Sequence, residues 1–194
     1  MGALTFTATA LDGTDDFSRT IEAARKGDLD AFEAIVRRYE RLVLVTALRL
    51  VGSLLDAQDV SQEVFLRLYR NLGKVEAERN FSGWLYRVTV NLCHDLRRRR
   101  PEMVAVEDGP ELVSGDADPQ RQITEAERRR VLAMSLRILA EKERAALVLR
   151  DLEGLSTEEV ARALGCSEAT VRSQISKARV KVREFVERYF RRRE

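Results

Sequence analysis

Six polar residues near the C-terminus carry the side-chain types that read DNA. They are Arg172, Ser173, Gln174, Ser176, Lys177 and Arg179. Arginine and glutamine can form paired hydrogen bonds with base edges in a major groove, while lysine and serine bind phosphates or bases. Apolar residues recur among them at helical spacing, at Val171, Ile175, Ala178 and Val182. This spacing predicts a helix that packs its apolar side inward and leaves its polar side free for DNA.

The residues that precede this helix predict a helix-turn-helix. Ser156 and Glu159 have the spacing of a capping box, which begins a short helix. Gly165 suits the left-handed position that ends it, and Ser167 is a good N-cap for the following helix. The alternative is a solvated face on an ordinary helical hairpin. We favour DNA binding because the cap, the glycine turn and the basic face occur in the right order.

Charge is unevenly distributed along the 194-residue chain, whose formal net charge is +2. Residues 101–120 hold six acidic and no basic residues, together with all three prolines, whereas residues 19–100 and 121–194 are each net basic. An acidic stretch that contains proline and lacks periodicity is typical of a linker. We therefore expect two small domains, at 19–100 and 121–194, joined by a flexible acidic linker at 101–120. Residues 1–18, which lack basic residues, are expected to form a disordered tail.

The first domain reads as one helix after another, with little period-two alternation. The expected helices are Ser18 to Lys26, Asp28 or Asp30 to about Val51, and about Leu55 to Asn71, with breaks at Gly27 and Gly52. Because the second domain is also helical, the predicted fold class is all-α.

Several functional classes lack the residues they need. The chain has no glycine-rich phosphate loop and a single histidine, His94, so we expect no enzyme, cofactor or small-molecule substrate. Cys93 and Cys166 lie far apart and lack the further ligands of a zinc site, which predicts neither metal nor disulfide and a reducing compartment. The longest apolar run, 42–45, is too short to span a membrane, and no export signal is present. We expect a cytoplasmic protein.

Two stretches of the first domain could bind partners. Asp56, Asp59 and Glu63 line one helical face that could dock on a basic helix, although acids at a helix N-terminus also favour the helix itself. Phe81 and Trp84 lie among basic and amide residues, a composition that suits separated DNA strands. The alternative is that these aromatic side chains belong to the core.

These motifs together resemble the extracytoplasmic-function, or group 4, sigma factors of bacterial RNA polymerase, which carry only the region 2 and region 4 domains. Residues 56–68 are similar to region 2.2, residues 81–91 to regions 2.3 and 2.4, and residues 141–181 to region 4. Three motifs in the right order, with a linker between the second and the third, make the resemblance specific.

The resemblance implies a transcription initiation factor that directs core polymerase to promoters and aids strand separation. The clamp helices of the polymerase β′ subunit would bind Asp56, Asp59, Gln62 and Glu63. The minus-ten element would be bound by Lys74, Arg79, Asn80, Phe81, Ser82, Trp84, Arg87, Asn91, Arg97 and Arg98. Within this set, the resemblance implies that the loop from Glu76 to Ser82 captures a flipped non-template base, with Asn80 and Phe81 as the preferred residues. The minus-thirty-five element would be bound by Ser167, Thr170, Arg172, Ser173, Gln174, Ser176, Lys177 and Arg179. The helix at 141–152 would face the β flap, and an anti-sigma factor is the expected regulator.

A stand-alone LuxR-like helix-turn-helix regulator is the main alternative. It would bind duplex operators without polymerase, and it leaves the acidic face and the aromatic, basic stretch without a role. Gln174 and Ser176 differ from the more basic residues common at these positions in sigma factors, so the promoter sequence that is read stays open.

Overall fold

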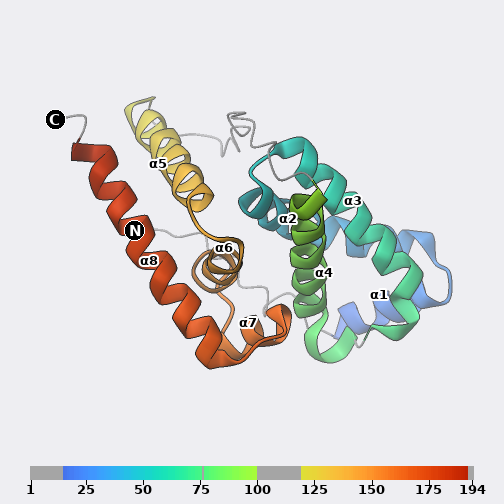
Figure 1. Cartoon of the computed structure of the whole chain (residues 1–194). Coiled ribbons are helices and arrows are strands. Elements are labelled where there is room, and N and C mark those ends of the chain that lie inside the picture. The colour runs from blue at the N-terminus through green and yellow to red at the C-terminus, as the bar shows by residue number, and fades with distance from the viewer. Residues whose placement is uncertain (1–14, 76, 100–118, 192–194) are drawn as a thin grey trace.

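The structure, a computed structural model, describes residues 15–75, 77–99 and 119–191, with side chains from 16–75, 81–99 and 125–191. Within these ranges the chain is helical and contains no strand, which confirms the all-α prediction. The first group of helices comprises α1 (Asp15–Arg25), α2 (Leu29–Val51), α3 (Leu54–Asn71), the short 3-10 helix η2 (Leu72–Lys74) and α4 (Ala77–Arg99). The second comprises α5 (Pro119–Arg137), α6 (Glu141–Leu147), the π-helical turn η3 (Val148–Leu152), α7 (Thr157–Leu164) and α8 (Glu168–Arg191). Figure 1 shows the two groups side by side.

Local sequence signals set the helix boundaries. Asp28 accepts a hydrogen bond from the backbone N–H of Ala31 at 3.0 Å and so begins α2. Gly52 ends α2 in the left-handed conformation, at φ 80°, where an L side chain would be strained. These positions confirm the predicted break at Gly52 and show that, of the two candidates Asp28 and Asp30, Asp28 is the cap.

The first domain begins earlier than the sequence indicates. Helix α1 starts at Asp15, and Phe17 is buried in the core, so residues 15–18 belong to the domain rather than to the expected tail. At the other boundary α5 starts at Pro119, inside the expected linker. The rest of the expected tail and linker, residues 1–14 and 101–118, lies outside the described residues.

An aromatic cluster holds α1, α2 and α4 together. The ring of Phe81 lies 5.3 Å from that of Phe17 and 5.0 Å from that of Tyr39, measured between centroids. All three side chains are buried. Because edge-on and tilted ring pairs stabilise beyond simple burial, this cluster fixes the start of α4 against α2.

The helix-turn-helix forms as the sequence predicts. Ser156 accepts from the backbone N–H of Glu159 at 3.2 Å, and the Glu159 carboxylate accepts from the N–H of Ser156 at 2.7 Å. Gly165 ends α7 at φ 64°, and Ser167 caps α8 by accepting from the N–H of Thr170. The apolar side of α8 at Val171, Ile175 and Ala178 is buried, which leaves its other side exposed.

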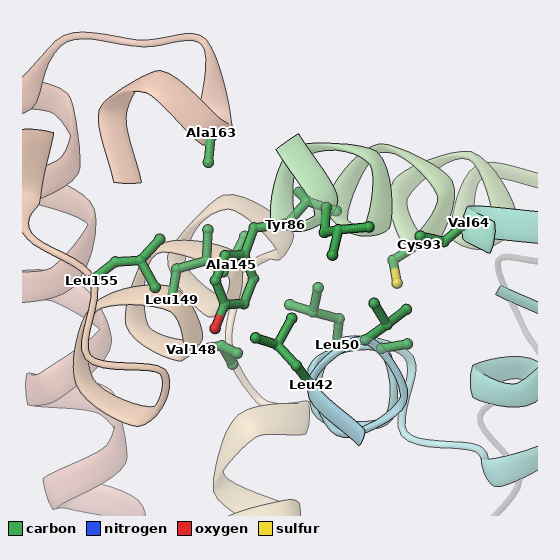
Figure 2. Close-up of a cluster of buried hydrophobic side chains, with 14 of the residues drawn as sticks. Leu42, Leu50, Val64, Tyr86, Cys93, Ala145, Val148, Leu149, Leu155 and Ala163 are labelled. Carbon is green, nitrogen blue, oxygen red and sulfur yellow. The ribbon is translucent and has the colours of Figure 1, made fainter. Parts of the chain in front are cut away.

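The two domains share one continuous apolar core. Figure 2 shows Tyr86 of α4 pointing among Ala145 and Leu149 of the second domain, with Leu42 of α2 close by. Helix α4 also packs directly on α7. No helix within the described ranges combines the length and the hydrophobicity that a membrane span requires.

Candidate partner and nucleic-acid interfaces

Helix α3 presents its acidic residues on the side that faces away from the core. Asp59 and Gln62 are exposed, and Asp56 and Glu63 are half-buried. Glu63 accepts a hydrogen bond from Arg67 at 2.9 Å, one turn further along the helix. The side chains of the four residues predicted to bind a partner are therefore all at least partly accessible to solvent on one side of α3.

The same helix exposes apolar side chains that the sequence analysis did not single out. Leu55, Leu66 and Tyr69 are 64%, 43% and 54% exposed. With Asp59 and Gln62 they form a stripe spaced four, three, four and three residues apart, the spacing of a coiled-coil seam. This row could have been predicted from the sequence, because Val60, Val64 and Leu68 already fill the face of α3 that packs on the core. We call the five residues of this row the α3 stripe.

Helix α4 places several of the residues predicted to bind DNA on one outward face. Arg87, Asn91 and Arg98 are exposed, Trp84 is half-buried, and their spacing of three, four and seven residues keeps them on one side of the helix. Arg98 also donates to Asp95 at 3.0 Å. Lys74 is exposed in η2, just before α4.

Three other residues predicted to bind DNA lie elsewhere. Phe81 is fully buried in the aromatic cluster, and Ser82 beside it is 7% exposed. Stacking of an unpaired base on Phe81 does not fit this position, because the side chain is fully buried and its ring contacts Phe17 and Tyr39. Arg97 donates to the backbone carbonyl of Leu50 at 3.2 Å. The side chains of Arg79 and Asn80 lie outside the described residues.

The exposed side of α8 gathers the residues predicted to read duplex DNA. Ser173, Ser176 and Lys177 are exposed and Gln174 is half-buried. Ser167 and Thr170 lie at the start of the helix, with their hydroxyl oxygens 2.9 Å apart. The set therefore forms one surface, in agreement with its predicted helical spacing.

Two arginines of this surface are held by carboxylates. Arg172 donates to Glu168 at 3.0 Å, one turn earlier. Arg179 makes two hydrogen bonds, of 2.9 and 2.7 Å, to Asp151 of η3. A paired arginine is fixed in direction, and its charge is partly neutralised before DNA arrives.

A shallow hollow of about 360 Å³ flanks this surface. Besides predicted residues of α8, it is lined by Arg150, Thr157 and Arg183, which the sequence analysis did not assign to DNA. Arg150 comes from η3 and Thr157 from the start of α7, so only the folded helix-turn-helix brings them beside Arg183. A concave group of guanidinium groups suits a backbone phosphate.

A partly buried ion pair holds α8 against α6. Lys181 donates to both carboxylate oxygens of Glu143, at 2.9 and 2.7 Å, and Glu143 is only 6% exposed. Glu143 also accepts from the backbone N–H of Ala140. The hydrogen bond from Lys181 is the main reason that the pKa of Glu143 lies below its usual value.

The cysteines and the histidine occupy structural positions. Burial raises the pKa of the Cys93 thiol to about 12, so it stays protonated. His94 lies 3.7 Å from Glu141. In the part of the chain that the structure describes, no three His, Cys, Asp or Glu side chains are grouped as a metal site would need.

Comparison with known families agrees with this geometry. Residues 35–101 match the Sigma-70 region 2 family, and residues 129–182 match the family described as Sigma-70, region 4. The first match covers most of α2, α3 and α4, and the second covers the helix-turn-helix. The fold and the two family matches thus define a protein of the sigma-70 class.

Individual relatives show to which subgroup of this class the chain belongs. The chain is 35% identical to the ECF RNA polymerase sigma-E factor of Escherichia coli K12 over 182 residues, which cover 89% of this chain and 95% of that protein. It is 34% identical to the RNA polymerase sigma-H factor of Pseudomonas aeruginosa, over 82% of this chain and 88% of that one. The solved structure of CnrH in complex with the cytosolic domain of CnrY has a TM-score of 0.65 and 28% identity, covering 89% of this chain and 98% of that one. The chain belongs to the extracytoplasmic-function sigma factors.

Proposed function

We propose that this sigma factor binds core RNA polymerase through the outer face of α3 and brings it to promoters with a minus-thirty-five and a minus-ten element. The observation that carries this proposal is the α3 stripe, an exposed helical seam within the region 2 match. The family consists of initiation factors rather than catalysts, so its activity is read out as transcription by the polymerase.

The α3 stripe suits a helical partner. Leu55, Leu66 and Tyr69 supply apolar contacts at coiled-coil spacing, and Asp59 with its neighbours supplies negative charge beside them. A clamp helix with apolar knobs and flanking basic residues would complement both features. Burial of apolar surface is a main driving force of protein association, so Leu66 is expected to contribute to binding alongside the acids.

Promoter contact would involve both domains. On α4 the outward face with Trp84, Arg87 and Asn91 has the cations and the ring that hold separated strands at the minus-ten element. On α8, Ser173 and Lys177 would face base edges of the minus-thirty-five element, while Arg150 and Arg183 hold phosphates of the adjoining backbone.

An anti-sigma factor is the proposed regulator. A second solved structure of similar fold is the sigma factor RpoE with the anti-sigma factor NepR from Bartonella quintana, with a TM-score of 0.62 and 22% identity. The stand-alone LuxR-like alternative is not favoured, because residues 35–101 match Sigma-70 region 2, which such a regulator would not need. Action on RNA polymerase would place the protein in the cytoplasm.

The first experiment measures transcription by sigma-free core polymerase from fragmented genomic DNA, with and without the full-length protein. New RNA 5′ ends that share two upstream elements are the expected result. The absence of new starts, with duplex binding by the protein alone, would instead support the LuxR-like regulator.

A paired set of variants then tests the α3 stripe. Asp59→Lys and Leu66→Ala should each weaken polymerase binding at least tenfold, about 1.4 kcal/mol, while circular dichroism stays helical. Glu40→Lys is the matched control, since Glu40 is an exposed acid on α2 outside the stripe. Equal binding by all three variants and the unmodified protein would remove α3 from the interface.

A further inference from the structure

Helix α6, which the resemblance places against the polymerase β flap, is covered on both sides. Every residue from Glu143 to Leu149 is buried. One side of the helix packs on α8 of its own domain, and the other reaches α2 of the first domain, as η3 also does. Only Glu141 and Lys142 at the start of α6 are exposed, so the rest of the helix offers little surface to a further partner.

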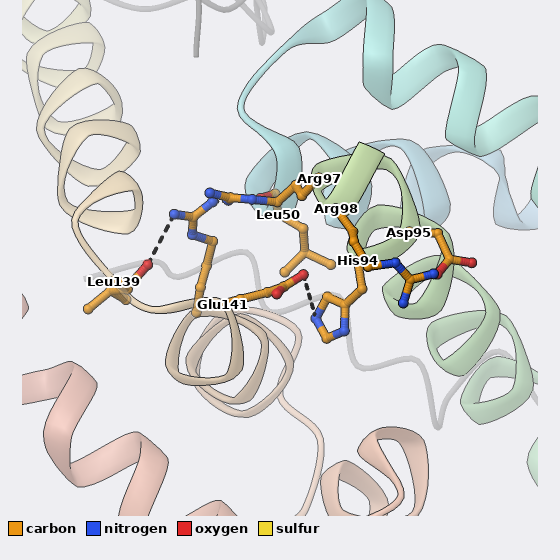
Figure 3. Close-up of polar contacts among 8 residues, drawn as sticks. Leu50, His94, Asp95, Arg97, Arg98, Leu139 and Glu141 are labelled. Atoms are coloured by element: carbon orange, nitrogen blue, oxygen red, sulfur yellow. Dashed lines mark hydrogen bonds and ion pairs between the residues drawn. The ribbon is translucent and has the colours of Figure 1, made fainter. Parts of the chain in front are cut away.

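The C-terminal end of α2 forms the first of two polar contacts between the domains, which we call anchors. Its last carbonyls have no partner within the helix and carry the negative end of the helix dipole. Arg144 of α6 donates to the carbonyl of Leu50 at 2.8 Å, and Arg137 of α5 donates to that of Gly52 at 3.5 Å. Arg97 of α4 donates to the same Leu50 carbonyl from within the first domain. Figure 3 shows Arg97 beside Leu50.

Arg144 is held at this anchor by several hydrogen bonds. It is 3% exposed and also donates to the carbonyls of Arg137 and Leu139, at 3.0 and 3.2 Å. These bonds lie within the second domain, so the domain carries a preformed guanidinium that fits the end of α2. Beside it, His94 of α4 faces Glu141 of α6 (Figure 3).

Glu153 is the second anchor. This carboxylate follows η3 in the second domain and is 5% exposed. Both of its oxygens bind the first domain: one accepts from Arg49 of α2 at 2.6 Å, the other from the hydroxyl of Tyr86 of α4 at 3.2 Å. A buried carboxylate needs such partners, so Glu153 favours the state in which the two domains touch.

We propose that the free protein is held closed by these two anchors, with the first domain acting as the intramolecular partner that masks α6 from polymerase. Engagement of polymerase by α6 then requires the second domain to leave α2 and α4. The α3 stripe stays exposed in the closed state, so the clamp contact can form first. Closure itself rests only on contacts within the chain, whereas its effect on polymerase rests on the proposed function.

Closure lowers the apparent affinity for polymerase by the fraction of molecules that are open. A variant that loses an anchor should therefore be more open and bind polymerase more tightly. Arg49→Glu places a like charge against Glu153 and should open the domains. Arg49→Glu combined with Glu153→Arg restores an opposite pair and should close them again.

The test measures the distance between spin labels in the free, full-length protein. Glu40→Cys and Glu184→Cys place one label on each domain at exposed positions, in a Cys166→Ala background, and Cys93 is buried. We expect one short, narrow distance for the parent, a longer and broader distribution for Arg49→Glu, and recovery in the reversed pair. Tyr86→Phe, a milder change, should give an intermediate shift. Arg37→Glu is the matched control, because Arg37 pairs with Glu33 on the exposed side of α2.

Core polymerase affinity is measured in parallel for the same variants. Arg49→Glu should bind about tenfold more tightly than the parent, and Arg37→Glu should bind equally. An unchanged distance in Arg49→Glu, with helical content intact, would overturn closure. A longer distance with unchanged affinity would overturn the masking of α6. A parent protein that binds no polymerase under any condition contradicts the proposed function instead, and leaves the distance measurement as the test of closure.

Discussion

Replacement of Phe81 by leucine distinguishes a core residue from one that captures a DNA base. Phe81→Leu keeps most of the apolar volume but removes both ring contacts, those with Phe17 and Tyr39. Each such pair contributes about 0.5–1.5 kcal/mol beyond burial, so the first domain should lose roughly 1–3 kcal/mol of its free energy of unfolding. With a denaturant slope of about 2 kcal/mol per molar urea, the midpoint should fall by roughly 0.5–1.5 M.

The single tryptophan of the chain makes this measurement specific. Trp84 is half-buried on α4, about one turn from Phe81, so its fluorescence follows unfolding of the first domain. Phe190→Leu, an exposed aromatic substitution at the far end of α8, is the control and should leave the Trp84 transition unchanged.

Transcription supplies the second half of the test. If Phe81 is a core residue, the folded Phe81→Leu protein should retain the unmodified ratio of activity on duplex and premelted promoters. An unchanged urea midpoint together with a selective loss on duplex promoters would refute the core assignment and restore base capture by Phe81.

Three further predictions concern the second domain and the cysteines. Ser156→Ala should lower the stability of the helix-turn-helix by about 1 kcal/mol, seen as a lower thermal midpoint, because the first N–H groups of α7 lose their cap; an unchanged midpoint would contradict this. The lowered pKa of Glu143 means that its ion pair with Lys181 stabilises the fold above pH 4.5, its ordinary value, and that this contribution is lost as the pH falls through the lowered pKa. Lys181→Met should therefore reduce the difference in unfolding free energy between neutral and acid pH, and an equal acid loss in both proteins would show that other groups are responsible. Cys93 should resist iodoacetamide at pH 8 until the protein unfolds, because its pKa is raised to about 12 by burial; mass spectrometry that finds it modified in the native protein would contradict its position.

Helix boundaries and the helix-turn-helix were accessible from sequence because their causes are local. Gly52, Ser156 and Gly165 each act within a few residues of their position, and the structure confirms all three. Of the two candidate caps for α2, Asp28 and Asp30, it selects Asp28. The polar side of α8 followed from the spacing of its apolar side. The α3 stripe could also have been predicted from the sequence, since the face of α3 that packs on the core is complete without Leu66.

The position of Phe81 and the domain contact could not be derived in this way. Phe81 has an aromatic, basic neighbourhood in sequence, yet its ring is covered by Phe17 and Tyr39 from distant helices. Glu153 reads as one acid in a polar turn, and only the packed domains bring Arg49 and Tyr86 to it. Both outcomes depend on tertiary contacts, which periodicity does not encode.

The anchor at the end of α2 also limits how closure can change by mutation. Its acceptors at Leu50 and Gly52 are main-chain carbonyls, which are present whatever side chain stands at those positions. A substitution at position 50 alters packing but cannot delete the acceptor. The donors, Arg137 and Arg144, are side chains and can each be lost in a single step. Substitutions in the first domain therefore tend to leave this anchor in place, and its strength changes mainly through Arg137 and Arg144 of the second domain. At the Glu153 anchor, by contrast, the first domain supplies the side chains of Arg49 and Tyr86, so substitutions there can weaken it directly.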